Sequence, residues 1–226
     1  MCKKVSMNHG GFGCDGGFGC DECSNRNVCH KLGPFVAVDA ACITPPPPVK
    51  RGSIIPFSSG VTTVELATIA NGAIGVPSLI GFGSAVPGLT ILNNTITLSN
   101  IITEAFVVPR VGNITAISAS FSALATVAVP PATPVPLAGK TTLRAQVYRA
   151  PEGSNVYTAT SVFVDLAPPF SGLLVGNEIA FNSANVAPFP VAVGDKLLMV
   201  FSIAATTGVT VAQSITGTAS AGITIE

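Results

Sequence analysis

The stretch Ile114-Thr115-Ala116-Ile117-Ser118-Ala119-Ser120-Phe121-Ser122 alternates between apolar and hydroxyl-bearing side chains over most of its length. A period of two that includes β-branched residues is typical of a strand that buries one face, whereas a helix repeats its apolar residues about every three to four positions. The stretch therefore predicts a strand, and it indicates that the surrounding fold is built from sheets.

Segments of the same kind lie on both sides of this strand. Leu89–Leu92, followed by Thr95–Leu98, shows the alternation most clearly. The other predicted strands are Val61–Ile69, Glu104–Val108, Thr141–Arg149, Tyr157–Leu166, Leu173–Phe181, Lys196–Ala204, Val209–Ile215 and Ala219–Ile225. Gly, Pro and Asn separate them, as in Pro168-Pro169. Short strands with such turns predict an all-β fold, an antiparallel two-sheet sandwich or jelly roll.

Composition divides the chain into residues 1–51 and residues 52–226. All six Cys and both His precede Gly52, and the whole chain contains no Trp. Charged residues make up only 10% of the chain and hydrophobic residues 48%, against about 25% charged residues in ordinary soluble domains. We interpret residues 52–226 as one domain whose charge-poor surface packs against other protein.

The few charges after Gly52 exclude one class of partner. Five cations are scattered there among seven acids, whereas a nucleic-acid binder needs clustered Lys and Arg to displace counterions. The cations are Arg110, Lys140, Arg144, Arg149 and Lys196.

Neither a membrane span nor a signal peptide is predicted. The most apolar windows, such as Val61–Gly83, are broken by Thr, Asn, Gly and Pro, so no membrane span is predicted. Met1–Met7 is followed by Gly, Asp and Cys rather than by an apolar run, so no signal peptide is predicted either.

Residues 1–51 are predicted to form an extended N-terminal arm. The hexapeptide Gly-Gly-Phe-Gly-Cys-Asp occurs twice in tandem, from Gly10 and from Gly16. Half of it is glycine, which leaves little side-chain surface to bury, so we expect this part to be flexible in the free chain.

The cysteines of the arm have three possible roles. Six thiols outside the folded body are placed to form disulfides with neighbouring molecules in an oxidising setting, and all six are candidates: Cys2, Cys14, Cys20, Cys23, Cys29 and Cys42. A zinc site at Cys20, Cys23, Cys29 and His30 is the weaker alternative, because the chain lacks a second paired knuckle at a fixed distance. The third possibility is that some of the thiols remain free.

Two further segments of the arm indicate a connector. Leu32, Pro34, Phe35, Val36 and Val38 form a short extended apolar segment that would dock as a strand. A polyproline spacer follows at Pro45, Pro46, Pro47 and Pro48 and would extend about 12 Å as a stiff left-handed helix. The alternative is a linker that packs on its own domain.

Several stretches of the body, in order, carry a resemblance to a known family. They are Gly52–Gly60, Ile80–Ser84, Ala105–Arg110, Gly112–Thr115, Leu197–Ser202 and Ala219–Ile223. In these stretches the chain resembles the C-terminal domain of the collagen-like exosporium glycoproteins of spore-forming bacteria, nearly from end to end of the body. The resemblance implies a jelly roll similar to tumour necrosis factor and the globular complement heads, assembled as a homotrimer on the spore surface and made in the mother cell without a signal peptide.

The N-terminus departs from that family. Its members usually carry Gly-x-y collagen repeats before this domain, and here the Cys- and Gly-rich arm with its polyproline stands in their place. This combination is similar to subunits of thin endospore appendage fibres, in which an N-terminal connector joins one trimer to the next. The implied partners are further copies of the chain and a spore-coat or exosporium anchor protein.

Catalysis is not expected. The body has no Cys or His to serve as nucleophile or base, and an acid pair is conceivable only if Asp165, Glu178 or Asp195 meet in the fold. No cofactor is expected either. Arg110 is a candidate for an inter-subunit charge contact, with Glu104 or Glu178 as its partner, or it is a solvated turn residue. The leading hypothesis is a structural spore-surface subunit; the alternative is a trimeric tip or a receptor- or carbohydrate-binding module.

Overall fold

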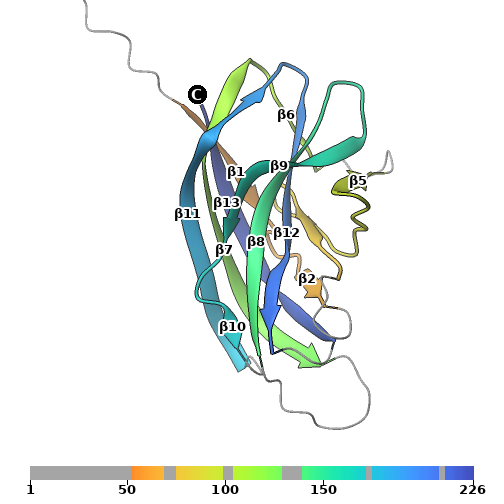
Figure 1. Ribbon diagram of the computed structural model, residues 1–226, viewed down its shortest axis with the longest axis vertical. Helices are drawn as coiled ribbons and strands as arrows, with labels where there is room; N and C mark the ends of the chain where they lie inside the picture. The colour runs from red at the N-terminus through yellow and green to blue at the C-terminus, as the bar shows by residue number, and fades with distance from the viewer. Residues whose placement is uncertain (1–51, 69–74, 99–103, 129–138, 172–174, 209–211) are drawn as a thin grey trace, which may run out of the picture. The chain divides into compact units, whose positions relative to one another are not determined.

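The computed structural model describes residues 52–68, 75–98, 104–128, 139–171, 175–208 and 212–226 (Figure 1). These ranges contain thirteen strands and no helix, which confirms the prediction of an all-β chain. They also contain no helix with the length and hydropathy that crossing a membrane requires. The body lies within a unit that spans Lys50–Glu226.

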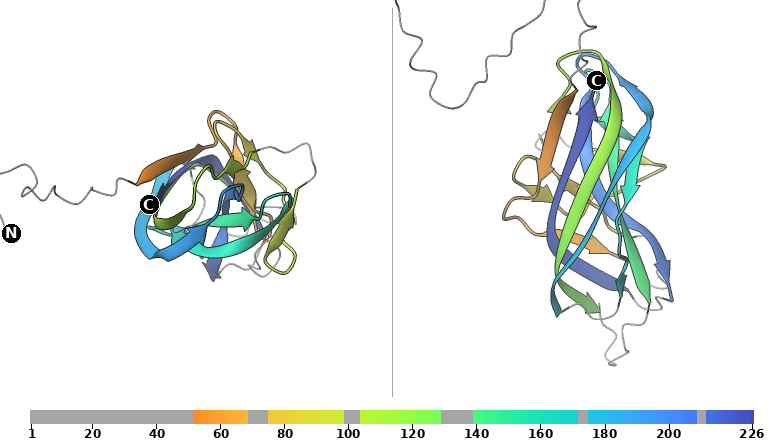
Figure 2. Two further views of the ribbon diagram at one scale, coloured as in Figure 1. Left: turned by 90° about the horizontal axis from the view of Figure 1, so that it is seen from above. Right: turned by 90° about the vertical axis from the view of Figure 1, so that its left-hand side faces the viewer.

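Five strands form one antiparallel sheet in the order β1-β13-β7-β11, with β2 pairing β13 beyond the end of β1. The right-hand view of Figure 2 shows β1, β13, β7 and β11 side by side. Their bounds are β1 Ser53–Ser58, β2 Val64–Ala67, β7 Gly112–Ala128, β11 Val175–Val191 and β13 Gln213–Ile225.

The other eight strands form a second antiparallel sheet. Its order is β4-β3-β12-β8-β9-β5, with β10 pairing β8 and β6 pairing β12. Their bounds are β3 Ser78–Ile80, β4 Ala85–Val86, β5 Thr95–Thr97, β6 Phe106–Val107, β8 Lys140–Ala150, β9 Val156–Asp165, β10 Phe170–Ser171 and β12 Lys196–Thr207.

The two sheets share one hydrophobic core, to which both contribute alternate residues of their long strands. Phe121 of β7 packs edge-on against Phe170 and tilted against Phe201, with ring centroids 6.0 and 6.3 Å apart. All three side chains are buried. Aromatic contacts of this geometry add stability beyond that of the buried area alone, so these rings join the two sheets.

A second, smaller cluster covers the opposite face of the eight-stranded sheet. Leu198 and Val200 of β12 lie in it, whereas Leu197, Met199 and Phe201 of the same strand lie in the main core. A strand buried on both faces is expected to lack polar alternation, and Leu197–Phe201 is indeed an unbroken apolar run. The partners in the second cluster are Leu79, Ile96, Leu98, Tyr148, Ala150 and Tyr157.

A bulge in β7 interrupts the alternation that was predicted for the stretch Ile114–Ser122. Ile114 and Ile117 are both fully buried, although strict alternation would place them on opposite faces. In the pairing with β13, Ile114 lies opposite Ile225 and Ala116 lies opposite Thr224, so Thr115 has no partner. Inserting one residue shifts the phase of the strand, which allows Ile114, Ile117, Ala119 and Phe121 all to face the core.

Several strand bounds differ from the predicted ones. β1 was not predicted, and it contains Pro56, which sheets tolerate at an edge where no amide donor is needed. β11 continues past Phe181 to Val191. Val209–Ile215 and Ala219–Ile225 were predicted as two strands, but β13 is continuous through Gly217. Leu89–Leu92 is not a strand, and Leu92 only bridges Thr95 across the turn at Asn93 and Asn94, whose φ angles are positive.

The stretches that carry the family resemblance pair with one another. Ser58 donates its amide to Gly81 O at 2.8 Å and accepts from Gly83 N at 2.8 Å. A side chain at Gly60, whose φ is positive, would collide with the carbonyl of Gly83. Phe106 lies opposite Leu197 in the same way. Residues of this kind hold loops and strands together, so they specify the fold rather than a reaction.

Candidate functional site

One face of the five-stranded sheet points away from the core, and its residues alternate with buried ones along each strand. The right-hand view of Figure 2 looks onto this surface, which we call the outer face. Its residues come from four neighbouring strands. They are Ile54, Pro56 and Ser58 on β1, Thr218, Ser220, Gly222 and Thr224 on β13, Ala116, Ser118, Ser120, Ser122 and Leu124 on β7, and Ile179, Phe181, Ser183 and Asn185 on β11.

The strand register sets these residues in rows. One row runs from Ser220 through Ser120 to Phe181, and the next from Gly222 through Ser118 to Ser183. Residues directly opposite each other on one face of a sheet are in side-chain contact range. Since most of them are small, the centre of the outer face offers little relief, and another protein surface is able to approach the backbone closely.

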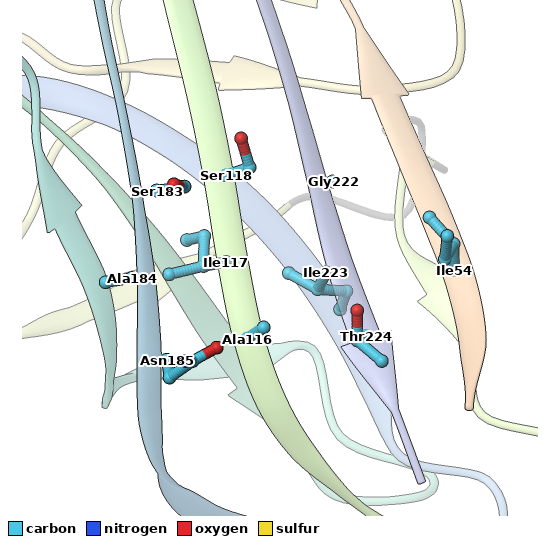
Figure 3. A pocket seen from close by; sticks show the side chains of 10 residues that line it. All are labelled: Ile54, Ala116, Ile117, Ser118, Ser183, Ala184, Asn185, Gly222, Ile223 and Thr224. Atoms are coloured by element: carbon cyan, nitrogen blue, oxygen red, sulfur yellow. The ribbon is translucent and has the colours of Figure 1, made fainter. Parts of the chain in front are cut away.

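Two shallow hollows mark the outer face. One, of about 310 Å³, has Gly222, Ser118 and Ala116 as its floor and Ile54 and Asn185 towards its sides (Figure 3). Figure 3 shows that these residues come from β1, β13, β7 and β11. The other hollow, of about 550 Å³, shares Ser118 and Gly222 with it and adds Ile179 and Phe181. The hollows exist because glycine, alanine and serine stand between larger side chains.

Large apolar side chains surround the hollows. Ile54 is 75% exposed, Phe181 67%, Ile179 56% and Leu124 47%. The outer-face residues on β1, β13, β7 and β11 carry no charge, and the charge that the described part of the sheet places on this side lies at its β2 end, where the Glu65 carboxylate accepts a hydrogen bond of 3.0 Å from the Ser214 hydroxyl. Large apolar side chains exposed together in this way are typical of an interaction surface.

Both edges of this sheet are partly covered. On β1, the bridge between Ser58 and Phe82 satisfies the outward backbone groups of Ser58, and Pro56 has no amide to offer. On β11, Ala167 and Phe181 exchange both backbone hydrogen bonds, at 3.3 and 2.9 Å. Prolines and short bridges of this kind discourage open-ended strand pairing. The edges of this sheet are therefore poorly suited to pairing with a further strand. The outer face is the better candidate for contact with another protein.

Arg110 lies at the edge of the body and is exposed. Its Nη2 donates to Ser53 Oγ at 2.9 Å, and within the described ranges neither Glu104 nor Glu178 forms an ion pair with it. The Glu104 carboxylate instead lies over Gly81. The suggested contact of Arg110 with an acid of another subunit remains a prediction.

Two ion pairs were not predicted. Arg144 binds Asp165 through two hydrogen bonds, Nε to Oδ1 at 2.6 Å and Nη2 to Oδ2 at 2.9 Å, and its guanidinium lies 4.1 Å from the centre of the Phe163 ring. These bonds to Asp165 raise the pKa of Arg144 above its ordinary value. Arg149 binds Asp195. Asp165 and Asp195 are thus held apart by separate arginines, and the two do not form an acid pair.

The site residues predicted in the arm lie outside the described residues. This applies to all six cysteines, to the zinc alternative with His30, to the docking segment Leu32–Val38 and to the spacer Pro45–Pro48. Within the ranges that are described, no three His, Cys, Asp or Glu side chains are grouped as metal ligands.

Sequence reasoning did not identify the outer face as a surface. Its signal was present in the alternation of Thr216 to Thr224 and of Ser118 to Ser122, whose hydroxyl residues face outward. What the sequence does not show is that these two strands are neighbours and that Ile54 and Phe181, on β1 and β11, lie beside them. The face is created by the strand order.

No protein-family model and no curated protein matches the chain. Among solved structures, the chain is similar to one described as the structure of Eiger TNF from S. frugiperda, with 9% sequence identity and a TM-score of 0.34. The match covers 77% of this chain and 92% of that chain. An identity this low leaves function to be inferred from the side chains of the chain itself.

Proposed function

We propose that the chain is a structural subunit of the endospore surface, in the exosporium or in an appendage fibre. Three copies of its body associate as jelly rolls, and the trimers polymerise through the arm, residues 1–51. The sequence resemblance of Gly52–Gly60 and the later stretches supports the location, and the strand order and the outer face support the assembly.

The strand order agrees with a jelly roll. Numbered one to eight along the chain, the main strands are β1, β3, β7, β8, β9, β11, β12 and β13. In this numbering, and with the short strands left out, the order of strands across the five-stranded sheet is 1-8-3-6. The order across the other sheet is 2-7-4-5. Pairing the first strand with the last, and the second with the seventh, is the pattern obtained when a long hairpin folds into two sheets of a jelly roll.

The outer face is the observation that carries the proposal. Ile54, Ile179 and Phe181 are largely exposed on the part of the outer face formed by β1, β13, β7 and β11, which carries no charge, and burying such side chains stabilises an assembly by about 25 cal/mol per Å² of apolar area. In a closed three-fold arrangement each copy contacts the next through two different surfaces, so the outer face of one copy packs against another surface of its neighbour and none is left open. The small residues Ser118, Ser120 and Gly222 permit close contact at its centre.

Polymerisation is assigned to the arm. In the body, β1 begins at the exposed residue Ser53, directly after the arm in sequence. The six cysteines of the arm link neighbouring copies through disulfides, and the segment Leu32–Val38 docks on an adjacent trimer. Such a subunit performs no catalysis and binds no cofactor.

The test is the mass of the full chain in reductant, measured by sedimentation equilibrium. The wild-type chain is expected at three times the chain mass or at a multiple of it. Ser120→Arg places a charge in the centre of the outer face, between Ser220 and Phe181, and is expected to yield monomers. Ser161→Arg, at an exposed position of β9 in the other sheet, is the matched control and keeps the wild-type mass. A monomeric wild-type chain, or a Ser120→Arg chain with unchanged mass, overturns the proposal.

A further inference from the structure

A groove of about 500 Å³ lies on the eight-stranded sheet, on the face that points away from the shared core. It runs between β8 and β12 on one side and the segments around residues 75–76 and 89–94 on the other. Its volume falls within the range of sites for small molecules. Six residues supply its polar groups: Thr90, Asn94, Arg144, Gln146, Tyr148 and Ser202.

Tyr148 is the residue that distinguishes this groove from an ordinary surface depression. Its side chain belongs to the second apolar cluster and is only 4% exposed, yet it lines the groove. Among the described residues, none forms a hydrogen bond with its hydroxyl. Burial raises the pKa of this tyrosine and the charge of Arg144 partly opposes the shift, so the hydroxyl is held neutral and is available as a donor. The hydroxyl is not one of the described buried polar atoms that lack a partner, so it is open to water in the groove, and a ligand with an acceptor at this point takes the place of that water.

The groove is electrically neutral. Arg144 is the charged residue among those that line it, and its Nε and Nη2 are both directed at the Asp165 carboxylate. The Nη1 of Arg144 remains as a donor to a ligand. The positive charge of Arg144 is balanced by the Asp165 carboxylate. An anionic ligand would have to compete with Asp165, so the arrangement favours an uncharged one.

The remaining polar groups alternate between donors and acceptors. Gln146 donates its Nε2 to the Thr160 carbonyl at 2.7 Å, which leaves its Oε1 to accept. The Ser202 and Thr90 hydroxyls are able to act as hydrogen-bond donors or as acceptors. Leu89 and Ile91 add an apolar wall. Hydroxyl groups on a ring with C–H faces fit such a mixture, because each hydroxyl both donates and accepts.

We propose that this groove binds a neutral, hydroxyl-rich molecule of the size of a monosaccharide. The Tyr148 hydroxyl, Gln146 Oε1 and Arg144 Nη1 are its principal hydrogen-bonding groups. The site is independent of the outer face, since it lies on the other sheet, so failure of one proposal leaves the other standing.

The experiment is a calorimetric and saturation-transfer NMR titration of the full chain with methyl α-D-glucopyranoside, D-galactose and N-acetyl-D-glucosamine. At least one is expected to saturate with a Kd on the order of 1 mM. Tyr148→Phe removes only the hydroxyl and is expected to weaken binding about tenfold. Tyr157→Phe, at the other buried tyrosine of the same cluster, which is not among the groove residues, is the matched control and leaves the affinity unchanged.

A second variant tests the place of binding without touching Tyr148. Ser202→Leu fills the groove from β12 and is expected to abolish saturation, with folding checked by circular dichroism. D-glucuronate tests the charge argument and is expected to bind more weakly than the neutral sugars. The proposal is overturned if no neutral sugar saturates below about 50 mM, if Tyr148→Phe binds as well as the wild-type chain, or if D-glucuronate binds best.

Discussion

Arg149 and Asp195 form an ion pair that is almost closed to solvent on the acid side. Arg149 Nε lies 2.7 Å from Asp195 Oδ2, and the two side chains are 34% and 3% exposed. The buried Nε–H is not directed at the oxygen, and the hydrogen bond of the pair is the one from Nη2 to Oδ1 at 3.1 Å. The Ala192 amide donates to Oδ2 at 2.7 Å. The pair therefore ties β8 to the turn that precedes β12.

Removal of Arg149 is predicted to cost more than removal of the other paired arginine. Arg149→Met leaves the Asp195 carboxylate buried without a counter-charge, which destabilises the fold by about 3 kcal/mol. Arg144→Met leaves Asp165, which is 43% exposed and returns to water, so its cost is about 1 kcal/mol or less. Urea unfolding of the two full-length variants at equal protein concentration measures the difference. Equal losses would contradict the importance of burial.

Gly217 of β13 is predicted not to tolerate a methyl group. A Cβ at this position would collide with the backbone carbonyl of Ser122 and with the Phe121 ring, neither of which is free to move in the core. Gly217→Ala is expected to destabilise the fold by about 2 kcal/mol. Ser161→Ala, at an exposed position of β9 in the other sheet, is the control. Thermal unfolding followed by circular dichroism distinguishes the two, and a Gly217→Ala chain as stable as the control would refute the expected collision.

The two tyrosines of the chain are predicted to resist ionisation. Burial raises the pKa of both Tyr148 and Tyr157 above their ordinary value of 10.0. The unfolded chain thus loses its phenol protons at lower pH than the folded one. The resulting stabilisation is present in full below pH 10, and it is lost as the pH rises through the folded-state pKa values.

The chain contains no Trp and only these two Tyr, so the ultraviolet absorbance of phenolate follows them without interference. The native titration is expected to lie above the one recorded in urea. Arg144→Met removes the charge that lowers the pKa of Tyr148 and is expected to move the native curve further upward, whereas Lys140→Met serves as a control at an exposed cation. Coinciding native and urea curves would show that the phenols are solvated.

Replacement of all six cysteines by serine is predicted to leave the trimers intact and to weaken the assembly. The cysteines all lie in residues 1–51, whereas the outer face lies in the body. Negative-stain electron microscopy and detergent gels without reductant follow the two levels of assembly. If the serine variant survives boiling in detergent as well as the wild-type chain does, disulfide cross-linking is wrong.

The sequence predicts most of the long strands but not their limits. β8, β9 and β12 follow from β-branched and aromatic runs. The phase shift at Thr115 does not, because a bulge depends on how the partner strands β13 and β11 pair. Pro56 conceals β1, since proline is a turn signal unless the strand is known to lie at an edge.

The surfaces are harder to predict than the strands, because they require contacts between distant residues. Arg149 and Asp195 are 46 residues apart, and single charges without spacing give no indication that they meet. In the groove, Tyr148 comes from β8 and Ser202 from β12, and only the pairing of these strands places both side chains on the same face. The outer face was missed for the same reason.

The five-stranded sheet cannot be completed until β13, the last strand, has been synthesised. β1 and β2 are synthesised first, yet both pair with β13, which is made about 150 residues later. At typical rates of synthesis they wait on the order of ten seconds for that partner. During this interval β1 has no partner strand in the five-stranded sheet, so the side chains of Ile54, Ile55 and Phe57 stay unpaired on the newly made chain until translation has reached β13.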